Sequence, residues 1–134
     1  MSLRVIVAAC AAVLVLAAIG AAGKPAPPSY TVAQADRGRL AYIENCAECH
    51  GGQQNGKYGP ALNGPDARMQ WETVRTVYTF TTAQMPNGNA GGLPKETYLD
   101  IMAYLLRLHG NPPGTKPLTD AEATNSLAVI GESK

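Results

Sequence analysis

The clearest helical pattern of apolar and polar residues lies between residues 94 and 109. Pro94 suits the first turn of a helix, and Gly110 with Pro112 ends the run. Between them the apolar residues recur every three or four positions, which places one set on a common helix face: Tyr98, Ile101, Met102, Leu105 and Leu108. This pattern predicts a helix over 94–109.

A second helix is predicted to begin after Thr31 and to run to about Cys46. Thr31 and Gln34 have the spacing of a capping box, which marks a helix start. One face of this helix carries Ala35, Gly38, Tyr42 and Cys46. A glycine in mid-helix costs about 1 kcal/mol relative to alanine. We therefore expect another helix to cross closely at Gly38.

The middle of the chain predicts less regular structure. A shorter helix from roughly Met69 to Thr79 would place Trp71, Val74 and Tyr78 on one side, whereas residues 51–66 are rich in Gly, Asn, Gln and Pro and are typical of a loop. No stretch alternates as a β-strand does. The chain is therefore predicted to be mostly α, with three to four helices and long loops.

The first 23 residues resemble a signal peptide. Arg4 precedes an uncharged, mainly apolar run that ends in small residues at Ala22 and Gly23. We expect removal of residues 1–23 and export of the rest; the alternative is an uncleaved membrane anchor, since the run nearly reaches the length of a membrane span. Export implies a periplasmic protein if the cell is Gram-negative.

The predicted domain, residues 31–110, is flanked by two further segments. Residues 24–30 form a Pro-rich linker. Residues 111–134 are treated as a C-terminal tail with a short helix after Thr119, because Thr119 and Glu122 again have capping-box spacing. The sequence does not decide whether the apolar residues of this tail dock on the domain: Leu118, Leu127, Val129 and Ile130.

Charge adds one constraint on partners. The 134 residues include 11 Lys and Arg and 10 Asp and Glu, a formal net charge of +1. No basic patch favours nucleic acid. We expect a protein partner to be met through an apolar contact with few charges around it.

The strongest chemical signal is Cys46-Ala47-Glu48-Cys49-His50. Two thiols two residues apart, followed by an imidazole, match the attachment signature of a c-type haem. The thiols would add to the two vinyl groups, and His50 would then be the proximal iron ligand. Weaker alternatives are a thioredoxin-like redox pair, which requires a βαβ setting, half of a zinc site, or an accidental match.

The second axial ligand has four candidates: Met69, Met85, Met102 and His109. Met85 is favoured because it lies in an irregular segment, is followed by Pro86, and comes 35 residues after His50. That length allows the chain to pass around the cofactor to its opposite face. Met102 belongs to an apolar helix face, and His109 lies at a helix end, where histidine suits the helix dipole.

These features together resemble a class I monohaem c-type cytochrome over about residues 31–110. The resemblance implies a cytochrome c fold wrapped around one covalent haem c, with Gly38 and Tyr42 contacting the C-terminal helix near Ile101 and Tyr104. In the similar segment 58–62, it implies that the Pro60 carbonyl accepts a hydrogen bond from His50. For Trp71 and Tyr78 two roles remain: they line the haem, or they belong to the core.

The function that this resemblance implies is one-electron transfer without enzymatic activity. The expected partners are redox proteins, with a periplasmic dehydrogenase as donor and an oxidase or another cytochrome as acceptor. A fixed electron-transfer subunit of a stable complex, or a ligand-binding haem sensor if Met85 is not bound, are the alternatives. Contact with a membrane is expected only if the leader is retained.

Overall fold

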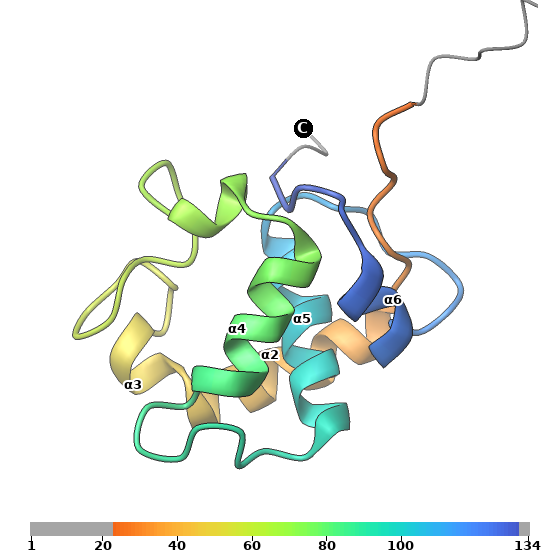
Figure 1. The fold of residues 1–134 in the computed structure, drawn as a ribbon. Coiled ribbons are helices and arrows are strands. Elements are labelled where there is room, and N and C mark those ends of the chain that lie inside the picture. Colours follow the sequence, from red (N-terminus) through yellow and green to blue (C-terminus); the bar gives the residue numbers. More distant parts are fainter. Residues whose placement is uncertain (1–22, 132–134) are drawn as a thin grey trace, which may run out of the picture.

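The computed structural model describes residues 23–131, and this part of the chain is helical (Figure 1). Its elements are α2 (Val32–Asn45), α3 (Ala47–His50), a 3-10 turn η2 (Arg68–Trp71), α4 (Val74–Gln84), α5 (Lys95–Leu108) and α6 (Asp120–Asn125). Within 23–131 the single β-type pairing is an isolated bridge between Thr73 and Val129. The prediction of a mostly α fold is therefore confirmed, with two short helices, α3 and α6, beside the three longer ones. The predicted leader lies outside the described residues, except for Gly23.

The crossing of α2 over α5 organises the core. A Cβ atom placed on Gly38 would lie 1.8 Å from the carbonyl oxygen of Asp100, so only glycine allows this approach. Arg37 donates two hydrogen bonds to the carboxylate of Asp100, at 2.7 and 2.8 Å. Arg107 of α5 pairs with Asp36 of α2 at 2.7 Å. The predicted reason for Gly38 is thus confirmed.

The start of α2 differs from a complete capping box. The Thr31 hydroxyl accepts a hydrogen bond from the Gln34 amide at 3.1 Å, as predicted. The buried Gln34 side chain does not return to Thr31. It bonds the main-chain N–H and C=O of Leu118 instead, at 2.7 and 3.0 Å. A buried amide group must find partners, and the C-terminal segment supplies both.

The predicted helix over 69–79 is wrong in its bounds and its continuity. A 3-10 turn ends at Trp71, Glu72 and Thr73 are extended, and α4 begins only at Val74. The Thr73 hydroxyl caps α4 by accepting from the Thr76 amide at 3.1 Å. The extended conformation is stabilised by hydrogen bonds to residues far along the chain, which a local pattern does not reveal.

Those residues belong to the C-terminal segment, which runs antiparallel to residues 70–75. The amides of Val74 and Arg75, which have no partner inside the first turn of α4, donate to the carbonyls of Ala128 and Ser126 at 2.9 and 3.1 Å. In the opposite direction the Ile130 amide donates to the Glu72 carbonyl at 3.0 Å. We refer to residues 126–131 as the C-terminal strap.

The segment treated above as a tail is packed on the domain. The structure buries four of its apolar side chains completely or nearly so: Leu118, Ala123, Ala128 and Ile130. The helix predicted after Thr119 is present as α6, and both hydrogen bonds of its capping box are formed. Leu127, in contrast, stays 50% exposed. Burial of apolar surface explains why residues 111–131 fold against the helices.

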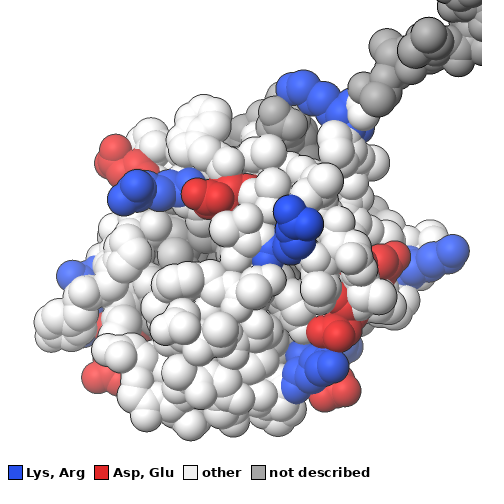
Figure 2. Space-filling model, in the orientation of Figure 1, with Lys and Arg blue, Asp and Glu red and all other residues white. Residues whose placement is uncertain are grey.

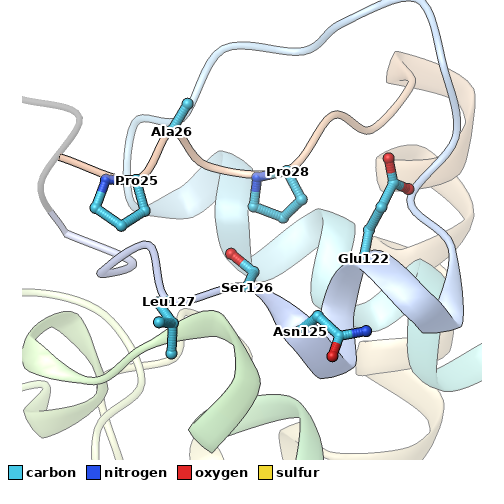
Figure 3. A pocket seen from close by; sticks show the side chains of 7 residues that line it. All are labelled: Pro25, Ala26, Pro28, Glu122, Asn125, Ser126 and Leu127. Carbon is cyan, nitrogen blue, oxygen red and sulfur yellow. The ribbon is translucent and has the colours of Figure 1, made fainter. Parts of the chain in front are cut away.

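The Pro-rich stretch ends in the core as well. Tyr30 is fully buried, and its hydroxyl donates to the carbonyl of Asn111. Pro25 and Pro28 face Asn125 and Leu127 across a shallow surface groove (Figure 3). Among residues 23–131, no helix has the length and apolar character needed to cross a membrane.

Candidate haem-attachment site

The two cysteines lie where α2 passes into α3. Cys46 ends α2, and its carbonyl accepts hydrogen bonds from the amides of Cys49 and His50, at 3.2 and 2.9 Å. This turn brings both thiols and the imidazole together on one short piece of backbone. Both cysteine residues are half-buried. Burial, and secondarily the nearby Cys49, raise the pKa of the Cys46 thiol to about 11.

The His50 ring is oriented by the loop that follows the motif. Its Nδ1 lies 2.8 Å from the carbonyl oxygen of Pro60. A carbonyl oxygen only accepts, so Nδ1 must carry the proton and the lone pair must lie on Nε2. The contact that the resemblance implied is present, and it leaves Nε2 as the nitrogen able to bind a metal.

Gly59 is packed against the same ring. A Cβ at this position would lie 2.9 Å from Cε1 and 3.0 Å from Nδ1 of His50. The main chain at Gly59 can therefore approach the imidazole closely only because there is no side chain there. Sequence reasoning did not single out Gly59; its place directly before Pro60 was the available signal.

The loop after the motif is tied to the α2–α5 crossing by two tyrosines. Tyr42 of α2 donates to the Gly51 carbonyl at 2.8 Å, and Gln54 donates to the hydroxyl of Tyr104 of α5 at 2.9 Å. The two tyrosine rings contact each other, with centroids 5.6 Å apart. The aromatic contact implied for Tyr42 and Tyr104 is confirmed, and it anchors the backbone on which His50 stands.

Met85 lies on another element, at the C-terminal end of α4. Its amide donates to the Thr81 carbonyl at 3.0 Å, which completes the last turn of the helix. Its carbonyl accepts from the Tyr98 hydroxyl at 2.6 Å and from the Gly91 amide at 3.2 Å. The Met85 residue is partly exposed. In Figure 1 the start of the loop after α4 lies at the same lower-left end of the view as α3.

The side chains of the other three candidate ligands are buried in the protein. Met102 is fully buried and Met69 is 9% exposed, and both belong to the hydrophobic core. His109 is 2% exposed, and its Nε2 lies 2.9 Å from the Leu62 carbonyl. Among the four candidates, Met85 is therefore the one outside the core of the described chain.

Trp71 and Tyr78, whose roles the sequence did not decide, have different environments. Trp71 is 76% exposed, so it is not a core residue. Tyr78 is 4% exposed and its hydroxyl donates to the Asp120 carboxylate at 2.7 Å. Burial and this bond raise the pKa of Tyr78 above its usual value, and the same bond, with Lys95, lowers the pKa of Asp120. Tyr78 therefore joins α4 to α6.

The donor set fits a covalently attached haem better than a bare metal ion. Within residues 23–131 no group of three or more His, Cys, Asp and Glu side chains is arranged to hold a metal ion. A haem requires only two thiols for attachment and one imidazole nitrogen below the iron. Cys46, Cys49 and the free Nε2 of His50 supply that set.

An uncharged surface lies over α4 and the loop that follows it. Residues 76–94 contain no Asp, Glu, Lys or Arg. Figure 2 shows the corresponding lower central part of this face without charged side chains, while positive and negative groups are scattered around it. Phe80 of this segment is 55% exposed. The fold and the attachment motif together define a haem-binding protein.

Comparison with known proteins identifies its family. Residues 33–105 match the family model described as cytochrome c oxidase, cbb3-type, subunit III. The chain is 39% identical over 75 residues to a cytochrome c-553-like protein of Synechocystis, covering 55% of this chain and 69% of that protein. The chain belongs to the c-type cytochromes, and its sequence carries one attachment motif. Its cofactor is covalent haem c, its function is electron transfer, and its partners are redox proteins.

Two further similarities concern dehydrogenases. The chain is 29% identical over 83 residues to a thiosulfate dehydrogenase of Psychrobacter arcticus, which is 54% of this chain but 25% of that protein. Its fold resembles that in the crystal structure of the sulfane dehydrogenase SoxCD from Paracoccus pantotrophus, with a TM-score of 0.58, 24% identity, and coverage of 87% of this chain and 71% of that chain. The structural likeness confirms the predicted cytochrome c fold, and the family match with the cytochrome c-553-like relative confirms haem c and electron transfer.

Proposed function

We propose that this protein is a one-electron carrier whose haem is attached through Cys46 and Cys49 and ligated by His50 and Met85. The observation that carries the proposal is the hydrogen bond from His50 Nδ1 to the Pro60 carbonyl. It fixes the tautomer in which Nε2 is a ligand and prevents the ring from turning away. Haem c, when bound, supplies a couple that exchanges one electron.

Each residue has a defined role in this proposal. The two thiols retain the cofactor, and the Pro60 carbonyl increases the electron density of the His50 imidazole. A neutral thioether from Met85 favours the reduced state and raises the reduction potential. If His50 and Met85 hold the haem iron, neither face of the iron would be left open to a substrate, so we propose that the chain itself is not an enzyme.

We propose further that the protein works in an exported compartment and accepts electrons from a dehydrogenase that oxidises sulfur compounds. The relationship to the Psychrobacter thiosulfate dehydrogenase supports this class of donor. The leader-like residues 1–23 support export. The uncharged surface of residues 76–94 suits a transient apolar contact, whose rate depends weakly on salt.

The ligand assignment is tested by absorption spectroscopy of the purified, haem-loaded protein. We expect the oxidised protein to show the weak far-red band of a sulfur–iron bond. Met85→Ala should abolish this band while the haem stays covalently attached. Met69→Leu is the matched control, because it removes a methionine from the core and replaces it with leucine, which has a similar volume. This variant should keep the band. Persistence of the band in Met85→Ala would disprove the assignment.

The donor class is tested by mixing the oxidised protein with a purified thiosulfate dehydrogenase and thiosulfate. We expect reduction at a second-order rate that changes by less than about threefold between 50 and 500 mM salt, because few charges take part. No reduction with this donor, alongside rapid reduction by ascorbate, would reject the donor while leaving electron transfer intact.

A fixed subunit of a stable complex is the second candidate. It is favoured by the family model, whose description names an oxidase subunit. Affinity purification of the full chain from its native host discriminates the two. A carrier should elute alone at its own mass, whereas a subunit should elute with a constant stoichiometric partner.

A further inference from the structure

Tyr98 connects the core to the loop that begins at Met85 by two hydrogen bonds. Its ring lies in the first turns of α5 and is 3% exposed. Its hydroxyl leaves the core and donates to the Met85 carbonyl at 2.6 Å. The same hydroxyl accepts from the Leu93 amide at 3.4 Å. One oxygen atom thus bridges the two ends of the segment 85–93.

The rest of that segment contains few other restraints. Within it, three amides donate to main-chain carbonyls: Gly91 to Met85 at 3.2 Å, Asn89 to Pro86 at 2.9 Å and Gly92 to Asn89 at 2.9 Å. Residues 87–92 are exposed to solvent, and Gly88 and Gly91 adopt positive φ angles of 86° and 72°. A loop with exposed backbone and few apolar contacts opens easily. Its position therefore depends on what holds its ends.

Both polar groups of the Met85 main chain are fixed by different elements. The amide is part of the last turn of α4, through Thr81, and the carbonyl is held by Tyr98 of α5. Because α5 is locked against α2 at Gly38, Tyr98 relates the Met85 backbone to the same helix crossing that anchors the His50 loop. A loop residue gains positional precision when a rigid element holds it.

We infer that Tyr98 is a positioning residue for the sixth ligand: its hydroxyl holds both ends of the 85–93 loop by hydrogen bonds and so keeps the Met85 sulfur on the iron. The inference rests on the proposed ligation by Met85. It assigns to Tyr98 a role that the helical pattern alone did not suggest, since the pattern placed Tyr98 only on the apolar face of its helix.

The test is displacement of the sixth ligand by free imidazole in the oxidised, haem-loaded protein, followed by loss of the far-red band. To admit imidazole, Met85 must leave the iron and the loop must move. Tyr98→Phe removes one oxygen atom and keeps the ring in the core. A hydrogen bond worth about 0.5–1.5 kcal/mol corresponds to roughly 2- to 12-fold, so we expect imidazole to bind Tyr98→Phe tighter by that factor.

Tyr78→Phe is the matched control. It also removes one hydroxyl from a buried tyrosine, but that hydroxyl bonds Asp120 and does not contact Met85. We expect its imidazole affinity to stay within about twofold of the wild type, even though its stability falls by a similar amount. Equal tightening in both variants would mean that general destabilisation opens the site, and would overturn the inference.

Met85→Ala separates failure of this inference from failure of the proposed ligation. If Met85→Ala keeps the band and binds imidazole no better than wild type, Met85 is not the ligand and the proposed function fails. If Met85→Ala loses the band while Tyr98→Phe behaves as wild type, only the role of Tyr98 fails. In the Met85→Ala background, adding Tyr98→Phe should change imidazole affinity by less than about twofold, because the coupling acts through Met85.

Hydrogen exchange of the wild-type protein tests the contact between Tyr98 and the 85–93 loop without any substitution. Saturation with imidazole should accelerate exchange in a peptide spanning residues 86–94, since the loop leaves Tyr98 when Met85 leaves the iron. Exchange in a peptide from the middle of α5 should not change. If the far-red band is fully lost and exchange in residues 86–94 stays unchanged, the inference is overturned. This outcome does not depend on whether the Tyr98→Phe variant can be produced as folded protein.

Discussion

The two sides of the haem site proposed above, that of His50 and that of Met85, are built from different kinds of contact. On the His50 side, the thiols and the imidazole occupy five consecutive residues, and the carbonyl that orients the ring lies ten residues on. On the Met85 side, the carbonyl is held by Tyr98, and the first turn of the helix that carries Met85 is held by the C-terminal strap, whose Ala128 carbonyl accepts from the Val74 amide. The attachment and orienting groups on the His50 side thus lie within residues 46–60, although their loop is also tied to Tyr104 of α5, whereas the helix that carries Met85 starts on the distant C-terminal strap.

This difference has a consequence for stability. Contacts close in sequence form with little loss of chain entropy, whereas contacts between distant segments require the whole fold. The Met85 side also depends on the C-terminal strap, which pairs with residues 70–75 and lies outside the matched family region 33–105. Perturbation of the fold should therefore release Met85 before it releases His50.

The largest effect is expected from removing both attachment points. In the Cys46→Ala, Cys49→Ala double variant, covalent haem should be lost, together with most of the soluble protein, because a chain of this size has little apolar core to spare. The measurement is haem staining of a denaturing gel and the yield of soluble protein. Abundant folded protein without haem would show that the polypeptide forms both sides by itself.

Shortening Ile130 should weaken the Met85 side selectively. Ile130 is fully buried and belongs to the C-terminal strap, so Ile130→Ala should cost about 2–4 kcal/mol. In a guanidinium titration of the oxidised protein, the far-red band should disappear at a lower concentration than the helical circular dichroism. Leu127→Ala, at a half-exposed position of the same strap, should change stability by less than about 0.5 kcal/mol. Coincident loss of both signals in Ile130→Ala would contradict the division into two sides.

A side chain at Gly59 should weaken the His50 side. Gly59→Ala would force its Cβ against the imidazole, and such overpacking costs about 1–3 kcal/mol. The expected result is a lower midpoint of unfolding with a perturbed haem spectrum. Gly52→Ala is the control, since a Cβ at Gly52 meets no atom within 4 Å. Equal midpoints for the two variants would show that the close approach at Gly59 is not required.

The smallest effect is expected at Asp120, and it depends on pH. The Tyr78 hydroxyl and Lys95 lower the pKa of the Asp120 carboxyl, so the folded protein favours the ionised form. Its contribution to stability is present above the unfolded pKa of about 3.9 and is lost as the pH falls through the lower folded value. Asp120→Asn should therefore lower the melting temperature at pH 7, and the difference from wild type should shrink below about pH 4. A difference that does not vary between pH 7 and pH 3 would rule out this carboxylate as its source.

Much of the fold could be predicted from local pattern. The helix over 94–109 is α5, and the capping signals at Thr31 and Thr119 mark true helix starts. Gly38 indicated a helix crossing because a mid-helix glycine costs free energy unless close packing requires it. These predictions succeeded because they depend on residues within one or two turns of each other.

The predictions that failed depend on distant partners. The helix expected over 69–79 is interrupted because the strap pairs with residues 70–75, and the Gln34 side chain leaves its own helix start because Leu118 is within reach. No local window contains these partners. The same limit explains why Gly59 and Tyr98 were not identified as parts of the site.

The sequence by itself determined the attachment motif, Cys-x-x-Cys-His, and the helices that frame it, and it supplied the candidate methionine in the segment after α4. Only the tertiary structure decided which groups orient those residues, namely the Pro60 carbonyl for His50 and the Tyr98 hydroxyl for the backbone of Met85. The physical reason is that the residue types able to bind haem are encoded within a few positions. Hydrogen-bond partners for a ring nitrogen or a loop carbonyl, in contrast, are selected by whichever backbone and side chains the folded core brings within about 3 Å.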